Sequence, residues 1–186
     1  ISFITFLSIA GVTAGVMALI IVIAVMAGFE SDLKSRILGV ESHIVLMHSR
    51  TPFSNYHNVD EYLKKVDGVE ASTPFAYTQT MLRSSAGLSG ALLRGIDPES
   101  AGGVIKNLEE TTLSNLAKQR AEGVRPGIIL GTELAKNMGI ITGESIYLIS
   151  PRGMIAPMGH LPSMKRFQVI GLFQSGMYEY DSSLAY

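Results

Sequence analysis

Residues 1–29 read ISFITFLSIAGVTAGVMALIIVIAVMAGF, and this stretch decides how the chain is organised. It contains no ionisable side chain, and about 20 apolar helical residues are enough to cross the hydrocarbon core of a bilayer. A signal peptide would have a basic start and a shorter apolar run. A helix buried in a soluble core would rarely run so long without a polar face. The stretch therefore predicts a transmembrane helix over residues 1–28, and the chain is expected to be a fragment that begins inside this helix.

The helical pattern continues past the membrane-compatible stretch. Leu33 and Ile37 keep the apolar spacing beyond the first charges, so the helix is expected to leave the membrane as an amphipathic rod. It is expected to end near Leu38, with Gly39 in a left-handed conformation as the stop. Acidic and basic residues balance just after the span, which favours an extracytoplasmic exit. These residues are Glu30, Asp32, Lys34 and Arg36.

One narrow face of the predicted helix carries small residues first and larger apolar residues later. At about 100° per residue the face is about 80° wide. Gly11 and Gly15 form a small-xxx-small pair, which lets another helix approach closely. The larger side chains either pack on a neighbouring helix or line a path for an apolar ligand, and both alternatives stay open. The face comprises Gly11, Gly15, Ala18, Val22, Met26, Phe29 and Leu33.

The composition of the chain excludes several kinds of protein. The 186 residues include no cysteine and carry a formal net charge of −1. Without cysteine there are no disulfides, thiolate zinc sites or cysteine nucleophiles. A nearly neutral charge argues against nucleic acid as a partner, because phosphate binding needs a cationic excess.

Residues 40–186 are predicted to form an α+β domain, because short strands alternate with short helices. Asn58 is expected to cap a helix that stops at Gly68, and Gly139 is expected to end another. Strands are expected at residues 43–47, 73–83, 91–96, 127–130, 145–149, 167–173 and 183–186. Helices are expected at residues 58–66, 104–119 (as a pair or one broken helix) and 132–138.

Motifs that carry catalysis are missing from the sequence. It contains neither a Gly-x-x-x-x-Gly-Lys phosphate loop nor a Gly-x-Ser-x-Gly nucleophile elbow. His43 and His48 are five positions apart, on opposite faces of the expected strand, and His57 and His160 are scattered. Such histidines are a poor set for one metal ion. We therefore expect no catalytic residue, no metal site and no cofactor in this chain.

Residues 150–162, SPRGMIAPMGHLP, are predicted to form the tip of an extended hairpin between two strands. An apolar exposed tip is typical of contact with a partner or a membrane. Prolines lower the entropy lost on docking, and methionine adapts to a varied surface. Lys165 and Arg166 would steer a partner with an acidic surface. The alternative is that the tip folds back over its own domain. The apolar residues of the tip are Met154, Ile155, Met158 and Leu161.

Four blocks of this sequence resemble the LolC/LolE family, the membrane subunits of the lipoprotein-releasing ABC transporter of Gram-negative bacteria. The blocks are residues 9–40, LRGIDPE at 93–99, IILGTELAKNMGI at 128–140, and residues 150–186. The resemblance implies four membrane helices, with a MacB-like periplasmic domain between the first two. That domain would have a porter-like part, an inserted sabre-like part and a projecting hairpin. Residues 40–186 would be this domain, truncated at its C-terminal end.

The resemblance also implies a mechanical activity. A separate LolD-like ATPase, which binds ATP and Mg²⁺, would drive two LolC/LolE-like subunits to squeeze an acylated lipoprotein out of the inner membrane to a periplasmic LolA-like carrier. The PMG tip favours a LolC-like role over a LolE-like or hybrid one. The residues matched to the substrate cavity are Val22, Met26, Phe29 and Leu33. Those matched to the carrier-docking hook are Met154, Ile155, Pro157, Met158 and Leu161, and those of the neighbouring pad are Met164 and Lys165.

Three other functions remain open at this point. A MacB-like efflux or mechanotransmission permease would lack the carrier-docking hairpin. An FtsX-like regulator of a periplasmic enzyme would also present an extracytoplasmic domain to a partner. A membrane-anchored hydrolase would need Ser182 or Ser183 beside a histidine in a cleft.

Overall fold

The computed structural model describes residues 2–48, 55–119, 125–156 and 159–186, and only the backbone within residues 151–162. Contacts divide the chain into two units, Ile1–Ile37 and Leu38–Tyr186. The predicted Pro157 and Met158 lie outside the described residues.

Helix α1 spans Ser2–Val40. Among the described residues it is the one helix long and apolar enough to cross a membrane, judged by length and composition. The predicted stop at Gly39 is wrong, because Gly39 is helical and has no positive φ. Tertiary partners extend the helix instead. The Asn107 N–H donates to the Gly39 carbonyl oxygen at 3.1 Å, and Val40 is fully buried.

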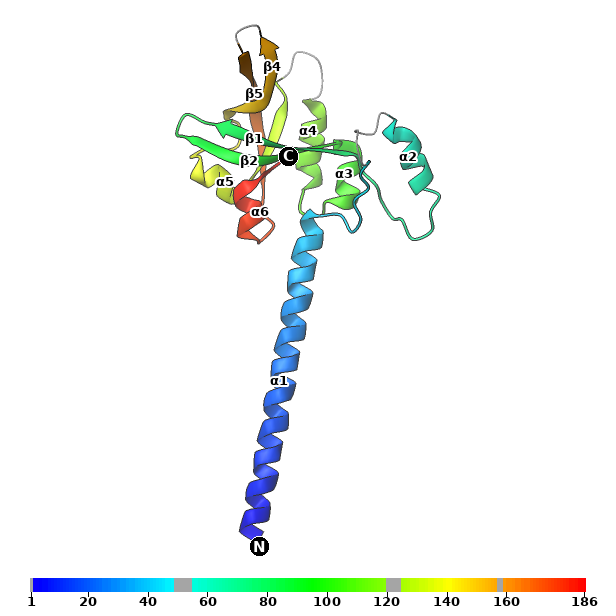
Figure 1. Ribbon diagram of the computed structural model, residues 1–186, viewed down its shortest axis with the longest axis vertical. Coiled ribbons are helices and arrows are strands. Elements are labelled where there is room, and N and C mark those ends of the chain that lie inside the picture. The colour runs from blue at the N-terminus through cyan, green and yellow to red at the C-terminus, as the bar shows by residue number, and fades with distance from the viewer. Residues whose placement is uncertain (1, 49–54, 120–124, 157–158) are drawn as a thin grey trace. The chain divides into compact units, whose positions relative to one another are not determined.

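Six strands of the second unit close into a barrel (Figure 1). Their order is β1-β2-β6-β3-β5-β4, and β4 pairs back with β1. Antiparallel pairs join β1 to β2 and β4 to β5, whereas β3 and β5 run parallel. The strands are β1 (Phe75–Arg83), β2 (Leu88–Ile96), β3 (Gly127–Gly131), β4 (Ser145–Ala156), β5 (Gly159–Phe173) and β6 (Leu184–Ala185).

Two apolar clusters stabilise the barrel. Alternate strand residues point inward, because successive side chains of a strand face opposite sides. The inner cluster includes Leu82, Leu130, Ile146, Leu148 and Val169, together with Leu134 of helix α5 (Thr132–Asn137). The second cluster combines strand residues with helices α3 (Pro98–Val104) and α4 (Glu110–Lys118), and it includes Ile105, Leu113, Ile129, Phe173 and Tyr186. These clusters confirm the predicted α+β class.

Several predicted elements need correction. Residues 43–47 form no strand, because β propensity needs a partner strand to pair with. His43 and His48 therefore do not lie on opposite faces of a strand, contrary to the prediction. Helix α2 (Tyr56–Leu63) begins after Asn55, so Asn58 is not its cap. Helix α6 (Tyr178–Ser183) was missed, and Gly139, with φ +58°, is confirmed as a helix stop.

The predicted hairpin is confirmed in its backbone. The register of β4 with β1 ends at Ile149, which lies opposite Met81. Beyond this point β4 and β5 continue as a two-stranded ribbon to the pair Ala156–Gly159. The ribbon extends past the barrel (Figure 1). The described hook residues Met154, Ile155 and Leu161 therefore lie on β4 and β5, the two longest of these strands.

Candidate functional site

The hairpin is a long antiparallel ribbon with one irregularity in its register. The last registered pair of the two strands is Ala156 with Gly159. The register shifts between Ser150 and Met154, an irregularity of the kind that bends a ribbon. Above it, Met154 lies opposite Leu161, so two predicted hook residues come from facing positions. Ile155 lies one position further along, opposite His160.

The structure separates the two residues predicted to form the pad. Met164 and Lys165 are consecutive in β5, so their side chains leave opposite faces of the sheet. Met164 is half exposed on the outer face, opposite Ile149. Lys165 lies on the other face, with its Nζ 5.8 Å from the centre of the Phe167 ring. The role of each residue stays a prediction. One partner could contact both side chains only if its surface reached around both faces of β5.

Sequence reasoning missed that strand β1 lies beside the base of the hairpin. Met81 is opposite Ile149, which is opposite Met164, so the three form one row across β1, β4 and β5. A second row consists of Arg83, Tyr147 and Arg166. We call these six residues the outer face. The alternation in β1 shows which of its residues face outward, but only the barrel closure shows what they lie beside.

The side chains of the outer face are accessible. Met81, Tyr147 and Met164 are 43%, 40% and 50% exposed, and Ile149 is half-buried. The Arg166 guanidinium lies 5.9 Å from the centre of the Tyr147 ring. This cation–π contact keeps two large side chains together beside the methionine row.

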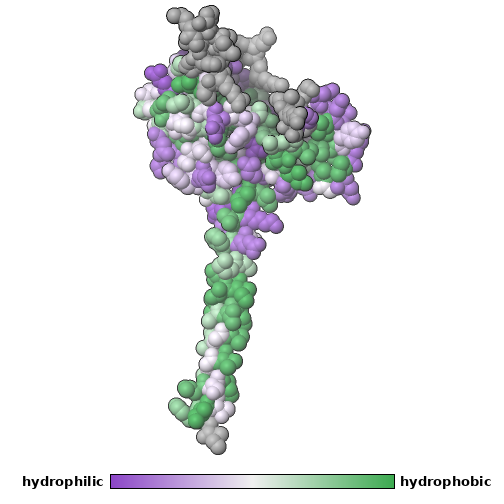
Figure 2. All heavy atoms as spheres, in the orientation of Figure 1, coloured by the Kyte–Doolittle hydropathy of each residue, from purple (hydrophilic) through white to green (hydrophobic). Residues whose placement is uncertain are grey.

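The predicted face of α1 is also accessible. A Cβ added at Gly11 or Gly15 would meet nothing within 4 Å, so another helix has room to approach there. Figure 2 shows apolar side chains along α1, and Val22, Met26 and Phe29 are all exposed. The roles assigned to these residues and to Leu33 stay predictions.

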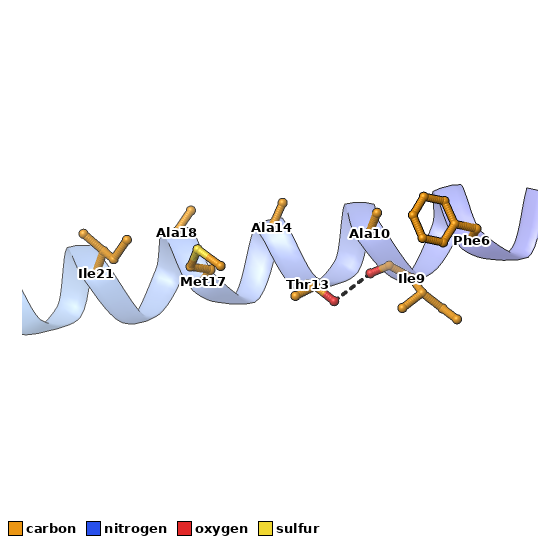
Figure 3. A pocket seen from close by; sticks show the side chains of 8 residues that line it. All are labelled: Phe6, Ile9, Ala10, Thr13, Ala14, Met17, Ala18 and Ile21. Carbon is orange, nitrogen blue, oxygen red and sulfur yellow. Dashed lines mark hydrogen bonds between the residues drawn. The ribbon is translucent and has the colours of Figure 1, made fainter.

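A shallow groove runs along the neighbouring surface of α1 (Figure 3). Its lining includes a row of alanines, Ala10, Ala14 and Ala18, together with larger side chains such as Phe6 and Met17. Together with Gly11 and Gly15, these alanines widen the small-residue surface of the helix. Such a surface is typical of close helix–helix packing in membranes.

A buried arginine holds the end of α1 within the second unit. Arg94 Nη1 donates to the Val40 carbonyl oxygen at 3.3 Å and to Glu41 Oε2 at 3.2 Å. The guanidinium also lies 4.7 Å from the centre of the Phe75 ring. A cation at the carbonyl end of a helix is favoured by the helix dipole. Tyr186 belongs to the same apolar cluster as Val40. Its burial there raises the pKa of its hydroxyl well above the ordinary value.

The serines considered for a hydrolase are bonded to helix backbone. Ser183 Oγ donates to the Glu179 carbonyl oxygen at 2.6 Å, and Ser182 Oγ donates to the same oxygen at 3.4 Å. These bonds are typical of serines near the end of a helix. They give the hydrolase alternative no support.

Comparison with known proteins identifies the class of this domain. The family described as MacB-like periplasmic core domain matches residues 5–185. The chain therefore belongs to that family, and the predicted MacB-like architecture is confirmed. The division into porter-like and sabre-like parts stays a prediction.

The more particular similarity is to proteins named lipoprotein-releasing system transmembrane protein LolC. The one from Neisseria meningitidis serogroup B is 33% identical over 187 residues, which cover 99% of this chain and 44% of that protein. The one from Xylella fastidiosa (strain Temecula1) is 32% identical, covering 100% of this chain and 44% of that protein. The resemblance to the LolC/LolE family is thereby confirmed. The chain spans less than half the length of these relatives.

A solved structure is also similar to part of the fold. The extracellular domain of the ABC-type transporter YknZ from Gram-positive bacteria matches 69% of this chain and 59% of its own, with 16% identity and a TM-score of 0.42.

Proposed function

We propose that this chain is part of a membrane subunit of an ABC transporter that extracts acylated lipoproteins from the bacterial inner membrane and delivers them to a periplasmic carrier. The observation that carries the proposal is the two-stranded ribbon, paired out to Ala156 and Gly159 beyond the barrel of a MacB-like periplasmic domain. The names of the LolC relatives support the lipoprotein cargo.

In this proposal the work of the chain is mechanical. Helix α1 lies in the inner membrane and residues 40–186 lie in the periplasm. A LolD-like ATPase binds ATP and Mg²⁺, and a second LolC/LolE-like subunit completes the channel. The acyl chains contact the apolar face at Val22, Met26, Phe29 and Leu33. Such a contact is favourable because each methylene buried from water contributes about 0.8 kcal/mol of binding free energy. The hairpin then docks a LolA-like carrier that receives the cargo.

The hook is tested at its tip. We expect Met158→Asp to abolish crosslinking between the transporter and its carrier, because a carboxylate cannot enter an apolar contact without a large desolvation cost. Pro157→Ala should weaken the crosslink by restoring chain entropy to the free tip. Crosslinking in membranes and the level of the subunit are measured together.

The matched control is Ile141→Asp. Ile141 is an exposed apolar residue in the connection between α5 and β4, outside the hairpin, so its replacement should leave the carrier crosslink unchanged. If Met158→Asp crosslinks as well as the parent, the hook assignment is wrong. An efflux or mechanotransmission permease would then explain the fold better.

The substrate face is tested at Met26. We expect Met26→Asn to lower the amount of acylated lipoprotein that co-purifies with the transporter about threefold, because an amide is costly beside an acyl chain. Met17→Asn is the control. Met17 lies about 180° around the helix from Met26, and the two side chains are similarly exposed, at 57% and 59%. Equal losses from both variants, or none from Met26→Asn, would contradict the assignment and favour helix packing.

A further inference from the structure

The outer face combines an apolar centre with a cationic rim. Adjacent strands lie about 4.8 Å apart, so the row Met81, Ile149 and Met164 spans about 10 Å. Arg83 and Arg166 flank Tyr147 in the next row. Met, Tyr and Arg are the residue types enriched in protein–protein contacts. The face therefore has the residue composition that is typical of a protein–protein contact surface.

Charge in this domain is segregated. The chain as a whole has 15 Lys and Arg against 16 Asp and Glu. Strands β1, β2, β4 and β5 nevertheless contain no Asp or Glu. Their cationic residues are Arg83, Arg94, Arg152, Lys165 and Arg166, and Arg94 is buried against Glu41. A partner that covers these strands must supply the acidic groups.

We propose that strand β1 belongs to the docking surface, with Met81 contacting an apolar patch of a soluble protein and Arg83 facing its acidic rim. This rests on the proposed function, because the partner is the carrier that the hairpin binds. Continuity supports this choice, since the hairpin leaves the barrel at the pair Ile149–Met164, directly beside Met81. A carrier held by the tip is thereby brought against three strands.

The contact is tested by photocrosslinking in the full transporter. A benzophenone amino acid at position 81 should crosslink to the carrier, and the same residue at position 78 should not. Thr78 is also exposed on β1 but lies on the other side of the strand. Crosslinks from position 81 to a second permease subunit or to lipid, or no crosslink, would overturn the proposal.

Substitutions test the energetics. Met81→Asp should weaken carrier binding about tenfold, and Arg83→Glu should lower the association rate about tenfold at low salt, with less effect at high salt. Arg83→Lys should keep most of the rate, and Thr78→Glu should leave the affinity unchanged. A third protein carries the benzophenone amino acid at position 158, in the predicted tip of the hairpin. If position 158 crosslinks to the carrier but Met81→Asp and Arg83→Glu bind it as well as the parent, the role of β1 is refuted and the proposed function stands. If neither position 158 nor position 81 crosslinks to the carrier, the proposed function itself is refuted.

Discussion

Replacing Gly131 with alanine is expected to destabilise the domain by about 3 kcal/mol, because the new methyl group would overlap the backbone of α6. A Cβ at position 131 would lie 2.7 Å from the carbonyl carbon of Asp181 and closer still to its oxygen. Gly131 has φ −62° and ψ 144°, values open to any residue. The requirement for glycine is therefore one of space, at the point where β3 passes into α5.

Gly90→Ala is the control for this prediction. Gly90 lies in β2, and a Cβ there would meet nothing within 4 Å. Alanine has less backbone freedom than glycine in the unfolded chain. Gly90→Ala should therefore leave the free energy of unfolding unchanged or raise it by about 0.5 kcal/mol. Urea unfolding of the chain in detergent, followed by circular dichroism, measures both variants. Similar midpoints for Gly131→Ala and Gly90→Ala would show that α6 moves away at little cost.

Replacing Arg94 with alanine is expected to cost about 2 kcal/mol of folding stability. Arg94 is 3% exposed and bonds to Val40 and Glu41, so its loss leaves the end of α1 without its cationic partner. Breaking a fully buried ion pair costs about 3–5 kcal/mol. The Glu41 side chain is 35% exposed, and solvent therefore reduces the loss. The same urea experiment measures the difference.

Arg94→Lys separates the charge from the shape of the side chain. A lysine keeps the cation but lacks the planar group that lies over Phe75 and reaches two acceptors. We expect it to recover about half of the lost stability. If Arg94→Ala were as stable as the parent, the ion pair would only offset the desolvation free energy of its own buried charges.

Much of the local structure follows from residue patterns. The uncharged run over residues 1–29 predicts a long apolar helix, and α1 contains residues 2–29 of it. The two apolar runs on either side of residues 150–162 predict a hairpin, and β4 and β5 pair through that segment. A glycine at position 139 predicts the end of α5, and in the structure its φ is +58°, a value that glycine adopts without strain. In each case neighbours in sequence decide the outcome.

Where the prediction fails, a distant partner is decisive. Residues 43–47 have strand propensity, but no strand within the described part of the chain pairs with them, so they form no ladder. Helix α1 passes Gly39 because Asn107 and Arg94 bind its last carbonyl groups. Neither effect has a signature within a short window of sequence.

The sequence by itself determined the long apolar helix, the α+β domain after it and the paired hairpin with its apolar tip. Only the tertiary structure decided that β4 pairs with β1, that Met81 and Arg83 lie beside Met164 and Arg166, and that Arg94 is buried at the end of α1. The physical reason is the distance along the sequence over which each interaction acts. Periodicity and turns act over a few residues, whereas closing a barrel depends on contacts between strands far apart in the chain, whose order no local pattern records.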